Sequence, residues 1–202
     1  MIRAIFFDLG KVLVDFDWNT AAEHISRKSE LKITEIIYRC TASDIAIAFE
    51  CGQLDSKEFL EKLKLSLRFR GTNNELHSLW TEIFTPIHNN IELLYRLKPH
   101  YTLGLISNTN TLHFDYICNT YDFTKEFDKL ILSYEVGAMK PARQIFEKAI
   151  VGMSLHSEEI IFIDDIAKNL VGATDLGWQT IHYTGHDALI KNLQIFNVII
   201  LK

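Results

Sequence analysis

Three groups of polar residues in this sequence carry side chains that could act together in one site. Asp8, the pair Ser107-Asn108 and the pair Asp164-Asp165 each come directly after a short apolar run. If the three groups met, three carboxylates would lie close together, and such a cluster of like charges is costly unless a cation neutralises it. Oxygen ligands at close quarters favour a hard ion such as Mg²⁺. The pattern therefore indicates a metal-assisted site.

These residues can meet only if the apolar runs before them are strands of one parallel sheet. The run 2–7 shows no polar alternation, which suits a central parallel strand covered on both faces. Right-handed crossovers keep the carboxyl ends of such strands at one edge of the sheet, where ligands gather in open α/β folds. Taken alone, Asp8 could equally cap the loop or helix that follows it.

Further strands alternate with helical segments along the rest of the chain. Apolar runs favour strands at 101–106, 129–133, 160–163 and 178–183. Helices are expected at 91–98, from Lys140-Pro141 onward, and after Asp165 through Ala173, with Gly177 as a C-cap. Strands that alternate with helices predict an α/β fold with a doubly wound, Rossmann-like parallel sheet.

The segment between the first strand and residue 88 has helical periodicity and no strand signal as good as the first one. Asp55 and Glu58 form a capping-box pattern at the start of one helix. We therefore predict a core domain made of residues 1–15 and 88–202. A small all-helical domain, residues 16–87, is inserted after the first strand.

Composition narrows the classes of function. The chain of 202 residues is 48% hydrophobic, which allows a proper core, and its net charge of −5 suggests neither a nucleic-acid surface nor an anionic membrane target. Cys40, Cys51 and Cys118 form neither a metal-binding pair nor a disulfide framework. No run approaches the ~18 apolar residues of a membrane helix. No signal peptide is recognisable, so a cytoplasmic protein is expected.

The apolar tail 193–201 fits an edge strand, a closing helix or a dimer contact, and nothing readable encodes the oligomeric state.

Four segments carry a family resemblance, and they occur in the expected order along essentially the whole chain: 6–15, 105–110, 133–141 and 162–169. In these segments the sequence resembles the haloacid dehalogenase (HAD) superfamily of phosphotransferases, subfamily IA. It is most similar to small bacterial sugar-phosphate phosphatases, including the glucose-1-phosphate type, that have a DLGxV first motif and an SNTNxLH second motif. Residues 49–54 also resemble the helical cap of these enzymes. The resemblance implies the HAD fold, a Rossmann-like core with a small helical cap.

The resemblance also implies a role for each matching residue. Asp8 would attack phosphorus and form an aspartyl-phosphate. Mg²⁺ would be held by Asp8, the Gly10 carbonyl and Asp165, with Asp164 acting indirectly or through water, or with the roles of the two aspartates reversed.

Other motif residues would bind the phosphoryl group or the substrate. Ser107 and the N–H of Asn108 would hold the transferring oxygens, and Lys140 would supply positive charge to Asp8 and to the phosphate. His113 matches the motif His and either faces the substrate or is a surface or hydrogen-bond-satisfied residue. Asn169 would orient its loop.

Gly10 departs from the pattern of most phosphatases of this superfamily, which carry an acid–base Asp two residues after the nucleophile. General acid–base help is commonly worth about 10²–10⁴-fold. Three outcomes stay open. The leaving group needs little help, as with a sugar 1-phosphate; or Asp15, Asp17 or His113 substitutes; or turnover is slow and the protein binds rather than catalyses.

The leading hypothesis is a Mg²⁺-dependent phosphatase of a small phosphorylated metabolite, a sugar phosphate in particular. A catalytically weak binding or regulatory protein that uses the same cleft is the alternative that Gly10 motivates. A haloacid dehalogenase is a third hypothesis, against which Asp164-Asp165 and the phosphate-type second motif argue. A small cap favours a small diffusible phosphate ester as the partner rather than a phosphoprotein.

Overall fold

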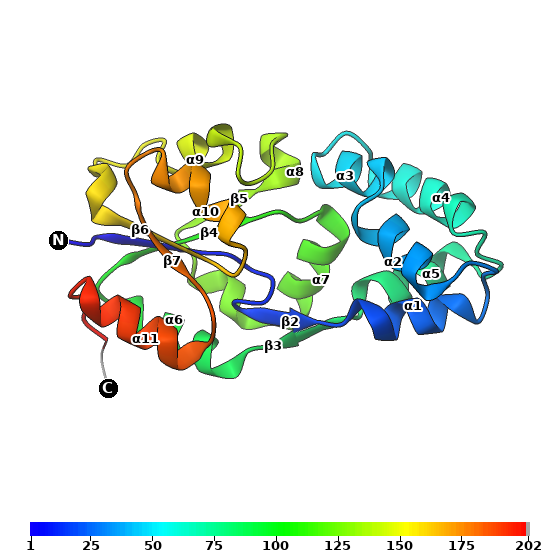
Figure 1. The fold of residues 1–202 in the computed structure, drawn as a ribbon, viewed down its shortest axis with the longest axis horizontal. Coiled ribbons are helices and arrows are strands. Elements are labelled where there is room, and N and C mark those ends of the chain that lie inside the picture. Colours follow the sequence, from blue (N-terminus) through cyan, green and yellow to red (C-terminus); the bar gives the residue numbers. More distant parts are fainter. Residues whose placement is uncertain (201–202) are drawn as a thin grey trace.

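Five parallel strands form the central sheet of the computed structural model, which describes residues 1–200 (Figure 1). The strand order is β5-β4-β1-β6-β7. The bounds are β1 Ala4–Phe7, β4 Thr102–Ser107, β5 Lys129–Leu132, β6 Ile160–Asp164 and β7 Gln179–His182. Each predicted strand is therefore confirmed to within about two residues. The expected α/β fold with a Rossmann-like parallel sheet is also confirmed.

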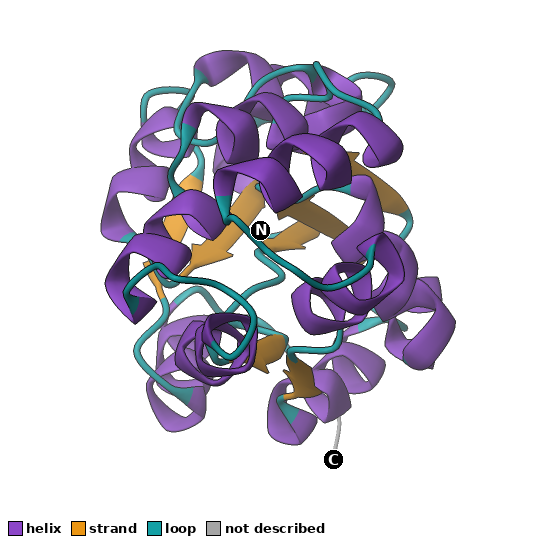
Figure 2. Cartoon of the chain, turned by 90° about the vertical axis from the view of Figure 1, so that its right-hand side faces the viewer, coloured by secondary structure: helices purple, strands orange, loops and turns teal. Residues whose placement is uncertain are grey.

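Both faces of the sheet are covered by helices, as Figure 2 shows. Successive strand side chains point to opposite faces. Ile5 and Phe7 therefore pack with one set of helices, and Ala4 and Phe6 with the other. The first set comprises α6 His88–Leu97, α7 Thr111–Thr120 and α11 His186–Ile195, and the second comprises α9 Arg143–Ala149 and α10 Ala167–Thr174. All four residues of β1 are fully buried, which explains its unbroken apolar pattern.

Gly104 leaves room in β4 for the ring of Phe6 on the neighbouring strand. A Cβ built at Gly104 would lie 2.1 Å from ring atoms Cδ1 and Cε1 of Phe6. We expect Gly104→Ala to lower the free energy of unfolding by about 1–3 kcal/mol, because overpacking a filled core forces side chains off their rotamers. Urea unfolding would measure the loss. Phe6→Leu should lower the free energy of unfolding less in the Gly104→Ala variant than in the wild type. An unchanged urea midpoint for Gly104→Ala would contradict the prediction.

Five helices lie between β2 (Val14–Phe16) and β3 (Phe84–Pro86) and form the block on the right of Figure 1. Their bounds are α1 Trp18–Ser26, α2 Ile33–Thr41, α3 Asp44–Glu50, α4 Ser56–Ser66 and α5 Asn73–Thr81. They enclose a core of their own, in which Phe49 and Phe59 stack with ring centroids 4.0 Å apart. The predicted capping box is confirmed, because Asp55 accepts from the N–H of Glu58 and Glu58 accepts from that of Asp55.

The structure corrects the prediction that this segment lacks strands. Val14–Phe16 and Phe84–Pro86 pair as a two-stranded antiparallel ribbon that carries the chain into and out of the helical block. Strands of three residues are too short to show alternation, and their pairing joins residues far apart in the sequence. Periodicity could not reveal them.

Two helix boundaries were also predicted wrongly. Lys140-Pro141 does not open a helix, because α9 begins at Arg143, and the Lys140–Pro141 peptide bond is cis. The Lys140 N–H donates to the Asn108 side chain, which holds this segment in the site loop. Gly177 does not cap α10, whose C-cap is Asp175. Gly177 instead supplies a left-handed residue, with φ +80°, to the turn that follows.

The apolar tail consists of the end of α11 and a short extension. The helix runs to Ile195, and Val198 packs against the same core as β1. Leu201 lies outside the described residues. Among residues 1–200, none of the helices has the length and apolar character that crossing a membrane requires.

Candidate active site

A buried lysine joins two carboxylates at the carboxyl edge of the sheet. Lys140 Nζ lies 2.7 Å from Asp8 Oδ1, at the end of β1, and 2.7 Å from Asp164 Oδ2, at the end of β6. It also donates to the carbonyl of Ile106 at 2.9 Å, so all three of its N–H bonds have an acceptor. The Lys140 side chain is 1% exposed. A lysine buried so fully is stable only when paired, and this one offsets the charge of both carboxylates.

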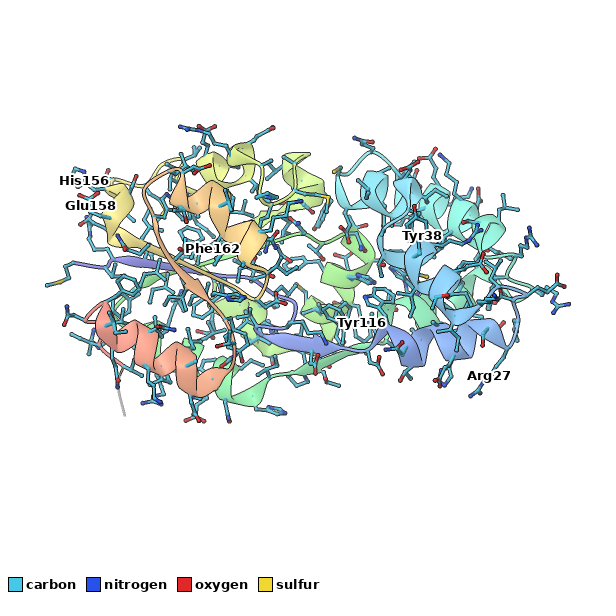
Figure 3. The ribbon with its side chains drawn as sticks, in the orientation of Figure 1. Arg27, Tyr38, Tyr116, His156, Glu158 and Phe162 are labelled. Carbon is cyan, nitrogen blue, oxygen red and sulfur yellow. The ribbon has the colours of Figure 1, made fainter. Side chains whose placement is uncertain are left out.

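Asn108 holds the backbone of Lys140 in place. Its Oδ1 accepts from the Lys140 N–H at 2.7 Å, and its Nδ2 donates to the Lys140 carbonyl at 3.2 Å. The ammonium also lies 5.3 Å from the ring centroid of Phe162, which belongs to the core on the α9 and α10 side of the sheet (Figure 3). The loop after β4 therefore sets the position of the lysine.

Burial makes Asp8 a weaker acid than an ordinary aspartate. Desolvation raises the pKa of Asp8 to about 7, Lys140 opposes the rise, and Asp164 adds to it. A nucleophilic carboxylate must be ionised, so a second positive charge beside Asp8 would lower this pKa and favour the reactive form.

The residues present fit a hard divalent cation. Ligand oxygens of Asp8, Asp164 and Asp165 all lie within 4.8 Å of one another. Burial and the neighbouring Asp164 raise the pKa of Asp165, which is half-buried. Three clustered carboxylates, which offer only oxygen donors, suit Mg²⁺.

Asp164 is the aspartate of the pair that is bonded to protein donors. It is fully buried, and its oxygens accept from Lys140, from the Ile166 N–H at 2.8 Å and from Asn169 Nδ2 at 3.1 Å and 3.2 Å. Asn169 thus holds the Asp164 carboxylate at the start of α10.

Ser107 ends β4 at the same edge and is buried. The loop after it is fixed to the residue that follows β5, because the Thr109 N–H donates to Ser133 Oγ and Ser133 Oγ donates to the Thr109 carbonyl. The structure therefore brings Asp8, Gly10, Ser107, Asn108, Lys140, Asp164 and Asp165 to one edge of the sheet.

His113 differs from the other predicted site residues, because both of its ring nitrogens are bonded within the protein. Nε2 lies 3.1 Å from the carbonyl of Trp80 in α5, and Nδ1 lies 3.1 Å from Asn110 Nδ2. Burial lowers the pKa of His113 to about 3, although the bond to Trp80 opposes the shift. The neutral ring stacks on Trp80 with centroids 4.7 Å apart. With both nitrogens bonded and one face stacked on Trp80, the ring has no free nitrogen to offer a substrate.

Phe16 fills the space beside Gly10. A Cβ at Gly10 would lie 2.9 Å from Phe16 Cε1, so an acidic side chain there would displace the ring. The other acids near the first motif are engaged elsewhere. Asp15 pairs with Lys11 at the surface, and Asp17 caps α1 through the N–H of Asn19.

A cavity of about 110 Å³ lies between the sheet edge and the helical block. Its lining comprises Leu9, Gly10, Phe16, Trp18, Cys40, Thr41, Glu50, Phe84, Ser107, Asn108, Thr109, His113 and Ile117. Tyr116, labelled in Figure 3, lies near this junction, with its ring 6.5 Å from that of Phe84. Phe49 and Trp80 do not line the cavity, because they are buried in the core of the helical block.

Sequence reasoning missed two kinds of site residue. Glu50 lines the cavity, and its only signal was its place in the cap-like segment 49–54. Asn90 is fully buried and donates to the Val12 carbonyl at 2.5 Å and to Tyr183 Oη at 2.9 Å, while its Oδ1 lies 2.8 Å from His186 Nδ1. It ties the loop after Asp8 to the residue that follows β7 and to the first residue of α11, and no local pattern marks it.

A parallel sheet that gathers carboxylates and a lysine at its carboxyl edge defines an α/β enzyme with the Rossmann-like fold of HAD proteins. The chain belongs to the haloacid dehalogenase-like hydrolase family, which residues 5–183 match. The resemblance that the four sequence motifs indicated is thereby confirmed.

Relatives and solved structures agree with this assignment. A D-ribitol-5-phosphate phosphatase of Bacteroides thetaiotaomicron is 28% identical over 188 residues, which cover 89% of this chain and 91% of that protein. The structure of a wild-type HAD family enzyme from the same species, in complex with magnesium and inorganic phosphate, superposes with a TM-score of 0.82 at 25% identity, covering 93% of this chain and 97% of that one. A HAD-like family hydrolase from Porphyromonas gingivalis gives a TM-score of 0.81 at 25% identity, covering 96% and 98%.

Proposed function

We propose that this protein is a Mg²⁺-dependent phosphatase of a small sugar phosphate or sugar-alcohol phosphate, acting through an aspartyl-phosphate on Asp8. The observation that carries the proposal is the buried cluster in which Lys140 bridges Asp8 and Asp164 at the sheet edge. The related phosphatase named for D-ribitol 5-phosphate supports the substrate class.

The side chains of this chain divide the reaction between them. An oxygen of the Asp8 carboxylate forms a bond to phosphorus as the ester bond to the leaving oxygen breaks, and water then hydrolyses the resulting mixed anhydride. The Ser107 hydroxyl and the Asn108 N–H donate to the transferring phosphoryl oxygens. Lys140 orients Asp8 and offsets negative charge as the phosphate approaches.

Mg²⁺ would be held by Asp8, the carbonyl of Gly10 and Asp165. The oxygens of Asp164 already accept bonds from Lys140, Ile166 and Asn169, which favours Asp165 over Asp164 as the direct ligand. When bound, the ion supplies positive charge that offsets the repulsion between the carboxylates and a phosphate dianion.

The chain divides, in this proposal, into a core of residues 1–15 and 88–202 and a cap of residues 16–87. The β2–β3 ribbon, which is the crossing point between them, is the natural hinge. Closure of the cap over the sheet edge would exclude water and restrict the site to small diffusible esters. A cytoplasmic location stays a prediction from the sequence.

We expect phosphate release from a panel of sugar phosphates and sugar-alcohol phosphates with Mg²⁺ present. Treatment with EDTA should abolish the release, because the carboxylate cluster then repels the substrate, and added Mg²⁺ should restore it. A colorimetric phosphate assay measures both steps. Full activity in EDTA would contradict the metal requirement.

The same panel separates the phosphatase from the alternative that Gly10 motivates. A protein that binds phosphate esters in calorimetry but releases no phosphate from any of them would be a binding or regulatory protein. Chloride release from 2-haloacids without added metal would instead indicate a dehalogenase.

A further inference from the structure

Glu50 is an acidic side chain in the cavity to which the proposed mechanism assigns no task. It is the last residue of α3 and lines the same cavity as Gly10, Ser107 and Asn108. Within residues 1–200, no hydrogen bond or ion pair engages its carboxyl group. A partly buried acid without a protein partner is costly, which suggests that its partner is a ligand.

The end of α3 is held close to the sheet-edge residues by two contacts. Gly52 packs so tightly on Tyr134 that a Cβ there would lie 2.1 Å from the Tyr134 carbonyl oxygen. Ser56 Oγ lies 3.0 Å from Thr111 Oγ1, which joins α4 to α7. Both contacts involve residues that follow Glu50 closely in the sequence, so they hold the end of α3 beside the cavity that Glu50 lines.

In-line phosphoryl transfer determines where a proton donor must be. The attacking and leaving oxygens lie on opposite sides of phosphorus. Asp8 attacks from the sheet edge, so the leaving oxygen points away from the sheet, toward the helical block. Of the groups that this block contributes to the cavity lining, Glu50 carries the only carboxyl.

We propose that Glu50 is the general acid that protonates the leaving oxygen, in the place of the carboxyl group that Gly10 lacks. This inference rests on the proposed phosphatase function. The bond from Asp8 to phosphorus forms, the phosphorus–oxygen ester bond breaks, and the Glu50 proton passes to the leaving oxygen, which departs as an alcohol. The water that hydrolyses the aspartyl-phosphate returns a proton to Glu50.

The environment and acidity of Glu50 suit this task. Burial raises the pKa of Glu50 to about 7, so a large fraction of the protein molecules carries a protonated Glu50 near neutral pH. The aromatic walls formed by Phe16, Trp18 and Phe84 favour the neutral acid. The other candidates are less suited, since Asp15 is paired with Lys11 and His113 has no unbonded nitrogen.

The test compares two esters of similar size that differ in their need for a proton. The leaving group of benzyl phosphate is a poorly acidic alcohol, which needs a proton from the general acid. The leaving group of 4-nitrophenyl phosphate is 4-nitrophenolate, which departs without a proton. Neither ester has a sugar hydroxyl, so loss of sugar recognition cannot mimic the effect. We expect Glu50→Gln to lower kcat/KM for benzyl phosphate by about 10²–10⁴-fold and for 4-nitrophenyl phosphate by less than about tenfold.

Controls make the outcomes distinct. Glu61→Gln, on the exposed surface of α4, should leave both values unchanged. Retained 4-nitrophenyl activity in Glu50→Gln shows that the variant folds. Equal losses on both esters, or no loss on either, would overturn the role of Glu50 while the phosphatase stands. A wild type that is as inactive as Asp8→Asn on both esters would reject the phosphatase itself, and the role of Glu50 with it.

Discussion

Replacement of Asp8 by asparagine is expected to lower kcat for the best phosphate ester by about 10⁴–10⁶-fold, the range seen when a covalent nucleophile is removed. The amide keeps the shape of the side chain but cannot form the aspartyl-phosphate. Steady-state phosphate release measures the loss, and mass spectrometry of acid-quenched enzyme should detect the phosphorylated aspartate in the wild type only.

The same variant separates catalysis from folding. Burial raises the pKa of Asp8 to about 7, well above the 3.8 of an unperturbed aspartate, so the fold favours the protonated form. Ionised Asp8 therefore lowers the free energy of unfolding when the pH is above about 7, the pKa of this group in the folded protein. This loss of stability fades as the pH falls from about 7 toward 4. Asp8→Asn should unfold at a temperature at or above that of the wild type at pH 8, with the difference shrinking by pH 5. A large drop in unfolding temperature at pH 8 would assign Asp8 a structural role instead.

Replacement of Lys140 by methionine is expected to impair both stability and activity. It leaves Asp8 and Asp164 buried without the ammonium that bridges them. Removing one partner of a buried ion pair typically costs about 3–5 kcal/mol in the free energy of unfolding. Loss of a cation that stabilises transferring phosphate typically costs about 10³–10⁵-fold in turnover. Urea unfolding at pH 7.5 and phosphate release measure the two effects.

A double variant tests whether Lys140 acts through Asp8. In Asp8→Asn, one of the two carboxylates that Lys140 offsets is already neutral. Adding Lys140→Met in that background should therefore destabilise the fold less than it does in the wild type. Lys191→Gln, on the exposed surface of α11, is a control for the loss of a cation away from the sheet edge. Lys140→Met with wild-type stability and more than about a tenth of wild-type activity would contradict the role given to the lysine.

The sequence alone was sufficient for the five strands of the central sheet and for the residues at its carboxyl edge. Unbroken apolar runs identify buried parallel strands, because both faces of such strands meet helices and favour apolar side chains. Asp8, Ser107-Asn108 and Asp164-Asp165 follow those runs directly, so their meeting at one edge follows from the right-handed crossover rule. The capping box at Asp55 was also readable, since it depends on residues three positions apart.

Only the tertiary structure decided which groups near the site are available for chemistry. The ring nitrogens of His113 are engaged by Asn110 and by Trp80 from the helical block, and Phe16 occupies the space beside Gly10. The β2–β3 ribbon and the place of Glu50 in the cavity likewise depend on contacts between segments far apart in the sequence. The physical reason is that periodicity and motif spacing report local conformation. Burial, pKa and hydrogen-bond partners depend on which distant side chains the packing brings together.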